Sequence, residues 1–350
     1  MEKDKNTKIR IGVIGAGMMG DHHIRVLINE CSELFEVTAF CDLHPPFQER
    51  AQKNLPNAVF FDDGVKLASS DLIDAVMIST PNATHKDLAM ASLNSGKHVF
   101  SEKPVATTFE DVDELIKVSA ESDLIYMIGH ELRYGRYYQL VKELIEQGEI
   151  GEIRSGWCQE FRGPFLKKVD DWMQDDRRSG GAITDKNCHH FDLMNWWVGS
   201  KSTKVFAMGA KDVVEVIGTE NEIIDNASIV YEYANGVRGM LQLCMFGAPD
   251  PSEGELRMGV IGEKGQMELK VVSRKIMVNF RDEKESLQLT VPGNSEKWFG
   301  HDGFVEEHEA FAHAILTGEA PLTRIENCAD GTRIAIAAEQ SIKSGAVEEL

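Results

Sequence analysis

Lys103 stands between Glu102 and Pro104, directly after the apolar run 98–101. A proline disfavours the α-helical region for the residue before it, so we expect no helix to continue through Lys103. Its amine is then presented at a strand end, which is where open α/β sheets bind their ligands. A cation there can stabilise negative charge on a reacting oxygen. An ordinary surface lysine would give the same Glu-Lys-Pro sequence.

A glycine-rich segment near the amino terminus has the pattern G-x-G-x-x-G and comprises Gly15, Ala16, Gly17, Met18, Met19 and Gly20. It follows an apolar strand pattern at 8–14 and precedes a helical pattern at 21–29. In a dinucleotide site, Gly15 permits the tight turn, Gly17 lets backbone approach a pyrophosphate, and Gly20 lets helix and strand pack closely. The unpaired N–H groups that open the helix then favour the phosphates.

Asp42 ends the next strand pattern, 35–41, at the distance from Gly20 expected of the acidic residue in such a site. Its carboxylate can accept hydrogen bonds from the ribose hydroxyls and would repel a 2′-phosphate. The residues that follow, 43–46, include no arginine to receive that phosphate. The predicted cofactor is therefore NAD, with NADP disfavoured.

Asp185, His189 and Asp192 form a second chemical pattern, because they share one face if a helix begins near Asp185. A carboxylate beside an imidazole fixes its tautomer and raises its basicity, which is what a general base needs. An amphipathic helix with surface histidines explains the pattern equally well. A metal site from Asp185, Cys188 and His189 is disfavoured, since the consecutive residues 188–190 cannot all converge on one ion, and no metal is expected.

The bulk composition limits the class of protein. A length of 350 residues predicts two domains, each with its own core. The formal charge of −20 argues against nucleic-acid or membrane-surface partners, because both are anionic. Six scattered cysteines without C-x-x-C spacing indicate reduced thiols, and neither a signal peptide nor a long apolar run is present, so we expect a cytoplasmic protein.

The first part of the chain alternates strand and helix patterns, which predicts βαβ units around a mostly parallel sheet. Further strands are expected at 59–61, 75–78 and 124–128, and further helices at 47–54, 85–93 and 107–122. The last of these should begin at Thr107, because Glu110 completes a capping box. The fold class is therefore α/β, with a Rossmann NAD-binding domain at 1–128.

From residue 129 the patterns predict an α+β domain, at 129–350, for substrate binding and oligomerisation. Its expected helices are 138–146, 190–198, 304–316 and 327–343, and its expected strands are 228–233, 237–246, 256–261, 266–272 and 275–280. Asn235-Gly236 and Lys264-Gly265 are hairpin signals, so the large open sheet should be mainly antiparallel. The run 237–246 is apolar on both alternating sets, which predicts a homodimer or homotetramer joined through this sheet.

With these features together, the chain resembles the glucose–fructose oxidoreductase / inositol dehydrogenase (Gfo/Idh/MocA) family, nearly end to end. The matching segments are 15–20, 80–85, 95–104, 148–153 and 311–321. The resemblance implies that Lys103, Asp185 and His189 form the catalytic set and contact the substrate together with Arg133. It also implies that the cofactor residues include, besides the glycine-rich turn and Asp42, Thr80, Pro81, Asn82, His85, Glu102 and Lys103.

The chain departs from the family pattern at two places. Asn187, beside Lys186, stands where the family usually has a small glycine, and Arg133 is a single arginine where many members have two. Both changes lie on the predicted substrate face, so they leave the chemistry intact and the particular substrate open.

The sequence thus predicts an NAD-dependent dehydrogenase that interconverts a secondary hydroxyl and a ketone on a sugar, sugar derivative or cyclitol. His189 would take the hydroxyl proton, Asp185 would orient His189, and Lys103 would stabilise charge on the oxygen. One alternative is an enzyme of the same fold that retains NAD and cleaves a glycosidic bond. Another is a non-catalytic sensor of NAD or a sugar, against which the intact catalytic set argues.

Overall fold

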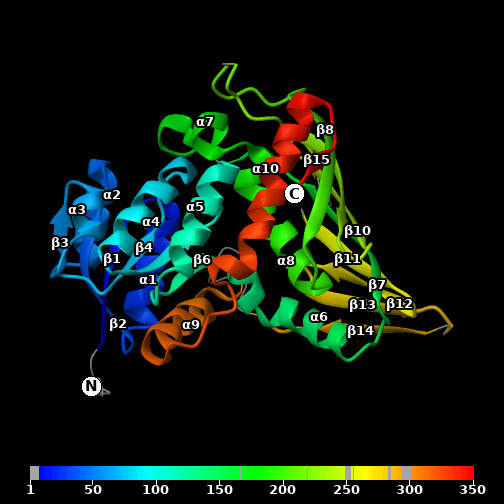
Figure 1. Cartoon of the computed structure of the whole chain (residues 1–350), viewed down its shortest axis with the longest axis horizontal. Coiled ribbons are helices and arrows are strands. Elements are labelled where there is room, and N and C mark those ends of the chain that lie inside the picture. The colour runs from blue at the N-terminus through cyan, green and yellow to red at the C-terminus, as the bar shows by residue number, and fades with distance from the viewer. Residues whose placement is uncertain are drawn as a thin grey trace. The chain divides into compact units, whose positions relative to one another are not determined.

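The computed structural model describes residues 8–165, 167–218, 220–248, 254, 256–282, 285–293 and 302–350. The chain divides into two compact units, Met1–Tyr134 with Gly303–Ala329 and Gly135–Asp302 with Asp330–Leu350 (Figure 1). The sequence predicts a boundary at residue 128, and the contacts among the described residues divide the chain after Tyr134. The segment 303–329, however, belongs to the first unit and not to the second, because Phe311 packs against Phe35 and Phe100.

The first unit is built on the predicted parallel sheet, with strand order β3-β2-β1-β4-β5-β6. Its strands are β1 (Ile9–Ile14), β2 (Phe35–Cys41), β3 (Val59–Phe61), β4 (Ala75–Ile78), β5 (His98–Glu102) and β6 (Tyr126–Gly129). Its helices are α1 (Met18–Asn29), α2 (Pro45–Asn54), α3 (Gly64–Ala68), α4 (His85–Asn94), α5 (Phe109–Ala120) and α9 (Phe304–Thr317), with the short turns η1 (Asn82–Thr84) and η2 (Glu131–Tyr134). The cap of α5 is Thr108 and not Thr107, because the Thr108 hydroxyl accepts the Asp111 N–H at 3.2 Å.

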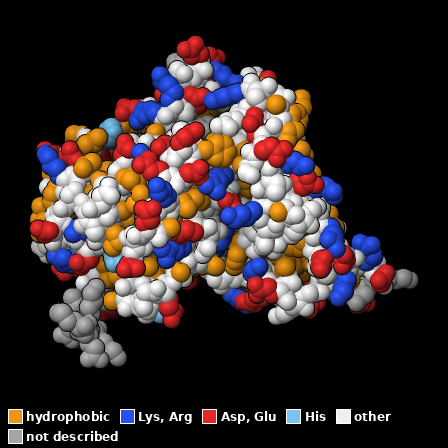
Figure 2. Space-filling model, in the orientation of Figure 1, with side chains coloured by type: hydrophobic (Ala, Val, Ile, Leu, Met, Phe, Trp, Pro, Cys, Tyr) orange, Lys and Arg blue, Asp and Glu red, His pale blue; other side chains and the backbone are white. Residues whose placement is uncertain are grey.

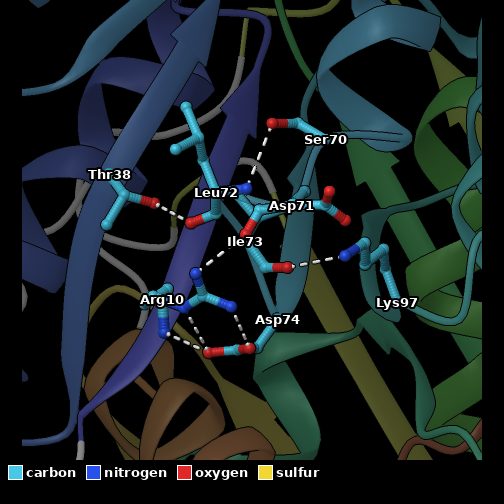
Figure 3. A network of polar contacts seen from close by, with 8 residues as sticks. All are labelled: Arg10, Thr38, Ser70, Asp71, Leu72, Ile73, Asp74 and Lys97. Carbon is cyan, nitrogen blue, oxygen red and sulfur yellow. Dashed lines mark hydrogen bonds and ion pairs between the residues drawn. The ribbon is translucent and has the colours of Figure 1, made fainter.

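Polar contacts hold the turn before β4 at the amino ends of the strands (Figure 3). The Arg10 guanidinium donates to the Asp74 carboxylate at 2.7 Å and to the Asp71 carbonyl oxygen at 2.8 Å. The Lys97 amine donates to the Ile73 carbonyl oxygen at 2.9 Å. These bonds satisfy turn backbone that would otherwise lack partners, and they fix the strands whose opposite ends carry the candidate site.

The second unit contains a nine-stranded sheet of order β14-β13-β12-β11-β7-β10-β9-β8-β15. The strands are β7 (Ile153–Phe161), β8 (Ser202–Ala210), β9 (Asn226–Tyr233), β10 (Arg238–Cys244), β11 (Leu256–Gly262), β12 (Gly265–Lys270), β13 (Lys275–Phe280), β14 (Ser286–Thr290) and β15 (Glu348–Glu349). The predicted hairpins β9–β10 and β11–β12 are confirmed, and the β7–β10 pair is parallel. The sequence patterns missed β7, β8, β14 and β15.

Helices lie along one face of this sheet (Figure 1). They are α6 (Arg136–Glu146), α8 (Cys188–Val198) and, from residue 330 onward, α10 (Ile325–Ser344). The unit also contains α7 (Asp176–Ser179), η3 (Val169–Gln174) and the π-helical segment η4 (Ile183–Asn187), which leads into α8. A Cβ on Gly156 of β7 would lie 2.3 Å from the sulfur of Met194, so glycine leaves room for this side chain of α8 against the strand. The Ser341 hydroxyl of α10 accepts the Ala207 N–H at 3.0 Å.

The opposite face of the sheet exposes apolar side chains, as the two-sided pattern predicted. Leu241 and Leu243 are buried, whereas Met240 and Val230 are 43% and 55% exposed. A row of side chains crosses neighbouring strands in the register Phe206, Val230, Met240 and Trp157. Figure 2 shows apolar side chains along the edge of the molecule where Figure 1 draws β8 and β10.

Two further sequence expectations concern the cysteines and the membrane. All six cysteines are free thiols, and five of them are buried. In the part of the chain that the structure describes, no helix has both the length and the apolar character to span a bilayer.

Candidate functional site

The glycine-rich turn connects β1 to α1, and its geometry requires glycine at two positions. Gly15 has φ of 89°, and a Cβ on it would lie 2.5 Å from the Ser79 carbonyl oxygen. A Cβ on Gly20 would lie 1.9 Å from the Gly15 carbonyl oxygen. Above Gly17, the nearest atom to a Cβ would be a Phe47 ring carbon at 3.9 Å, so the space there is open. Open space over backbone at a helix start is what a diphosphate requires, so the turn fits a dinucleotide.

Asp42 is fixed beside this turn at the carboxyl end of β2. Its carboxylate accepts the Ala16 N–H at 2.7 Å and the His44 N–H at 2.8 Å. Each carboxylate oxygen has more than one lone pair, so both oxygens keep capacity for a further donor such as a ribose hydroxyl. The structure therefore places Asp42 where the sequence predicted an acidic residue, next to the turn and at the end of the neighbouring strand.

The segment after β4 contains four residues predicted to bind the cofactor, Thr80, Pro81, Asn82 and His85. His85 is fully buried, and its two ring nitrogens lie 2.9 Å from the carbonyl oxygens of Thr80 and Pro104. Burial lowers the pKa of His85, so the ring is neutral near pH 7. His85 thus joins the loop after β4 to the loop after β5, and Asn82 is buried in the same segment.

Glu102 ends β5 and holds the backbone of Lys103. One carboxylate oxygen lies 2.8 Å from Nε2 of His23, and the other accepts the Lys103 N–H at 3.2 Å. Burial alone would raise the pKa of Glu102, but the hydrogen bond with His23, together with the charge of Lys103, lowers it to about 2. Sequence analysis missed His23, whose only local signal is its place on the buried side of α1, three residues after Gly20.

Asp185 and His189 lie in the second unit, on η4 and the first turn of α8. Helical winding begins at Ile183, slightly earlier than expected, and its first turn is π-helical, a form often found at functional sites. The carbonyl oxygen of Gly181, a residue with φ of 101°, accepts the Asp185 N–H at 3.0 Å. Both predicted catalytic side chains are largely buried, with Asp185 at 3% and His189 at 6% exposure.

A polar cluster on β7 adjoins this segment and was not predicted. Glu160 is buried, and its carboxylate accepts the Asn187 side-chain N–H at 2.8 Å. The Lys186 amine lies 3.8 Å from Glu160, and Arg162 donates to Glu160 at 3.2 Å. Although burial opposes it, the charge of Lys186 and then that of His190 lower the pKa of Glu160. Asn187 is fully buried and its side chain bonds to Glu160 within the second unit, and its expected place on the substrate face stays a prediction.

Arg133 lies in η2 of the first unit and is 3% exposed. Its guanidinium donates to the carbonyl oxygens of Leu322 and Asn327, at 3.4 and 3.2 Å. These bonds give Arg133 a structural role in holding the segment before and within α10, and its predicted contact with substrate stays a prediction.

Glu339 of α10 gives the second unit a testable pH dependence. It lies beside Gly181 and accepts the Ile183 N–H at 2.8 Å, but burial raises its pKa to about 7 from an ordinary 4.5. Because the pKa is higher in the folded than in the unfolded state, the contribution of Glu339 to the free energy of unfolding is fully present below about pH 4.5. It is lost as the pH rises through 7, by up to about 3 kcal/mol.

We expect Glu339→Gln to remove this loss, because the amide oxygen still accepts the Ile183 N–H and carries no charge. Urea unfolding between pH 5 and 8 measures the effect as the difference in free energy of unfolding between variant and wild type. This difference should favour the variant increasingly as the pH rises. Parallel pH profiles for the two proteins would show that Glu339 does not titrate in this way.

The fold and the site together define a class of protein. A parallel sheet with a glycine-rich dinucleotide turn, followed by a unit with a large antiparallel sheet, is the architecture of two-domain NAD-binding oxidoreductases. The chain belongs to the Gfo/Idh/MocA oxidoreductase family: residues 9–130 match the family's NAD-binding Rossmann fold, and residues 142–350 match its C-terminal alpha/beta domain. The predicted family and fold class are thereby confirmed.

Relatives in this family carry different activities in their names. Myo-inositol 2-dehydrogenase of Thermotoga maritima is 26% identical over 96% of both chains. 2,7-Anhydro-N-acetylneuraminate hydratase of Escherichia coli is 24% identical, with 89% of this chain and 88% of the relative covered. Scyllo-inositol dehydrogenase of Lactobacillus casei, solved with bound NAD(H) and scyllo-inositol, has a TM-score of 0.81 at 24% identity, covering 98% of this chain and 99% of the relative.

Proposed function

We propose that this protein is an NAD-dependent dehydrogenase that interconverts a secondary hydroxyl and a ketone on a cyclitol, sugar or sugar derivative. One observation carries the proposal: Glu102 bonds to His23 and to the Lys103 N–H and so fixes the backbone of Lys103. Lys103 thereby lies at the carboxyl ends of the parallel strands, where the dinucleotide turn also lies. The relative from Thermotoga maritima, named for myo-inositol, supports a cyclitol as the first substrate to test.

NAD, when bound, supplies the hydride acceptor for the carbon that bears the hydroxyl group. Lys103 donates a hydrogen bond to the reacting oxygen and stabilises the negative charge that develops there, which is the costly part of alcohol oxidation. His189 removes the hydroxyl proton, and Asp185 orients His189 and stabilises its protonated form. Arg133 contacts the substrate. In the reverse direction the same groups protonate a carbonyl oxygen.

A panel of substrates tests this function. We expect net NADH formation, followed by absorbance, with at least one member of a set of inositols and sugars. Cleavage of aryl glycosides without net NADH would instead support the glycoside-cleaving alternative, and the hydratase of Escherichia coli makes that alternative worth including. A protein that binds NAD or sugars and catalyses neither reaction would be the non-catalytic sensor.

The cofactor preference is a separate prediction. We expect NAD to bind at least tenfold more tightly than NADP, because the Asp42 carboxylate would accept ribose hydroxyls and repel a 2′-phosphate. Asp42→Asn keeps an oxygen for the Ala16 N–H. It should reduce the difference between the affinities for NAD and NADP, because it removes the repulsion between the carboxylate and the 2′-phosphate. Fluorescence titration with both nucleotides measures the ratio. Equal affinities of the wild-type protein for NAD and NADP would refute the assignment.

We also propose that the exposed face of the large sheet joins subunits into a dimer or tetramer. Val230 lies between Phe206 and Met240 in the apolar row, so Val230→Glu would place a charge in the interface. Light scattering should give two or four times 39.0 kDa for the wild type and 39.0 kDa for this variant. Leu316→Glu, at a similarly exposed leucine of α9, is the matched control and should leave the mass unchanged. A wild-type monomer at micromolar concentration would exclude the oligomer.

A further inference from the structure

The first unit contains a buried cluster of histidine and carboxylate groups that the proposed chemistry does not use. The cluster consists of His23 of α1 and of Glu307 and His308 of α9. Each residue offers one ligand atom, and these three atoms lie within 4.8 Å of one another. All three residues have 0% exposure. The two helices are therefore joined at this point by groups that are all able to bind a metal ion.

The hydrogen bonds of the two rings determine which nitrogens face each other. His308 Nδ1 lies 2.6 Å from the carbonyl oxygen of Phe304, so that nitrogen carries a proton. His23 Nε2 lies 2.8 Å from the Glu102 carboxylate, so that nitrogen also donates. The remaining nitrogens, His23 Nδ1 and His308 Nε2, face each other at 3.2 Å, and in neutral rings each carries a lone pair. Two lone pairs repel at this distance unless a proton or a cation lies between them.

Glu307 distinguishes a cation from a proton. Both oxygens of its carboxyl group are buried and make no hydrogen bond within the ranges that the structure describes. A buried polar group without a hydrogen-bond partner costs free energy. A proton shared by the two rings would still leave the Glu307 carboxyl group without such a partner. Protonation of Glu307 would leave its O–H without an acceptor. Glu102 and Glu131 add negative charge around Glu307, which favours a positive ion at the cluster.

We propose that His23 Nδ1, His308 Nε2 and one oxygen of Glu307 bind a single divalent transition-metal ion, with zinc preferred. Two nitrogens bound to a tetrahedral zinc ion at about 2.0–2.1 Å lie roughly 3.3 Å apart, close to the separation of the two rings. The outer nitrogens have the partners common in metal-bound histidines, a carboxylate for His23 and a backbone carbonyl for His308. Imidazole and carboxylate ligands together suit zinc.

The proposed ion has a structural role in the first unit. It connects α9 to α1. It also stabilises the end of β5, because the outer nitrogen of His23 donates to the Glu102 carboxylate, which accepts the Lys103 N–H as well. The proposal is independent of the substrate, because none of the three ligands belongs to the predicted catalytic set.

Metal binding by the full-length protein tests the proposal without any assay of activity. The protein is stripped with a chelator, reconstituted with zinc chloride, gel-filtered and analysed by mass spectrometry for metals. We expect about one zinc ion per chain. Titration of the stripped protein with cobalt chloride should produce the visible absorption bands of tetrahedral cobalt, saturating at one equivalent.

Variants locate the site. His308→Ala and Glu307→Gln should each lower bound zinc at least tenfold, and circular dichroism checks that the variants are folded. His313→Ala removes an exposed histidine further along α9 and should keep the wild-type stoichiometry. A folded wild-type protein that retains less than 0.1 zinc per chain and shows no cobalt spectrum would overturn the proposal. Full zinc retention by both single variants, Glu307→Gln and His308→Ala, would overturn it as well.

Discussion

Replacing Lys103 or His189 by alanine is expected to lower kcat by two orders of magnitude or more, with NAD affinity changed by less than a few fold. Removing a group that stabilises charge or transfers a proton in the transition state typically costs that much. Neither side chain is predicted to hold the phosphates or the adenosine ribose, which the glycine-rich turn and Asp42 bind. Initial rates on the substrate found in the panel, together with fluorescence titration of NAD, separate the two effects.

Matched controls and the pH profile make this prediction specific. Lys66→Ala and His313→Ala remove a lysine and a histidine at exposed positions of the first unit, and both should keep wild-type turnover. Because a histidine base must be neutral, the wild-type rate should rise with pH between about 6 and 8. The His189 variant should lose that rise. Wild-type turnover by the His189 variant would exclude it as the general base.

The second large effect is expected from Gly20→Ala. The added Cβ would lie 1.9 Å from the Gly15 carbonyl oxygen, and a backbone atom cannot rotate away as a flexible side chain can. The turn and α1 must therefore separate, which should lower the free energy of unfolding by about 3 kcal/mol. The same displacement moves the N–H groups that meet the diphosphate, so NAD affinity should fall at least a hundredfold. Urea unfolding and fluorescence titration measure the two effects.

Gly17→Ala is the matched comparison within the same turn. Its Cβ would meet nothing closer than 3.9 Å, so we expect the free energy of unfolding to change by less than about 1 kcal/mol. The methyl group would occupy the open space that the diphosphate approaches, and NAD should therefore bind at least tenfold more weakly. If Gly20→Ala unfolded and bound NAD like the wild type, the turn would not have the geometry described here.

Much of the first unit was predictable because its signals are local. A buried parallel strand is an apolar run, a helix start follows from a capping residue, and a tight turn or close approach requires glycine at Gly15 and Gly20. These signals placed the six strands of the sheet and the dinucleotide turn within a few residues. The short helix α3 was missed because only Asp63, whose side chain accepts two backbone N–H groups, marks its start.

The second unit was harder to predict because its largest contacts join distant segments. β7 pairs in parallel with β10 and antiparallel with β11, both far away along the chain, so no turn signal announces it. Asn187 illustrates the consequence. Its side chain bonds to Glu160 of β7, a strand that was not predicted, so this contact could not be foreseen, while its expected place on the substrate face stays a prediction.

The sequence by itself determined the family, the two kinds of sheet and the dinucleotide turn, since each depends on residue types in local patterns. The catalytic set of Lys103, Asp185 and His189, which the family resemblance implies, stays a prediction. The tertiary structure alone decided that 303–329 joins the first unit, that Glu102 is held by His23, and that His23 meets His308 and Glu307. His23 and His308 are 285 residues apart, and their contact depends on how α9 packs against α1. Packing between distant segments leaves no periodic trace in the chain, so only the folded structure reveals which buried charges meet.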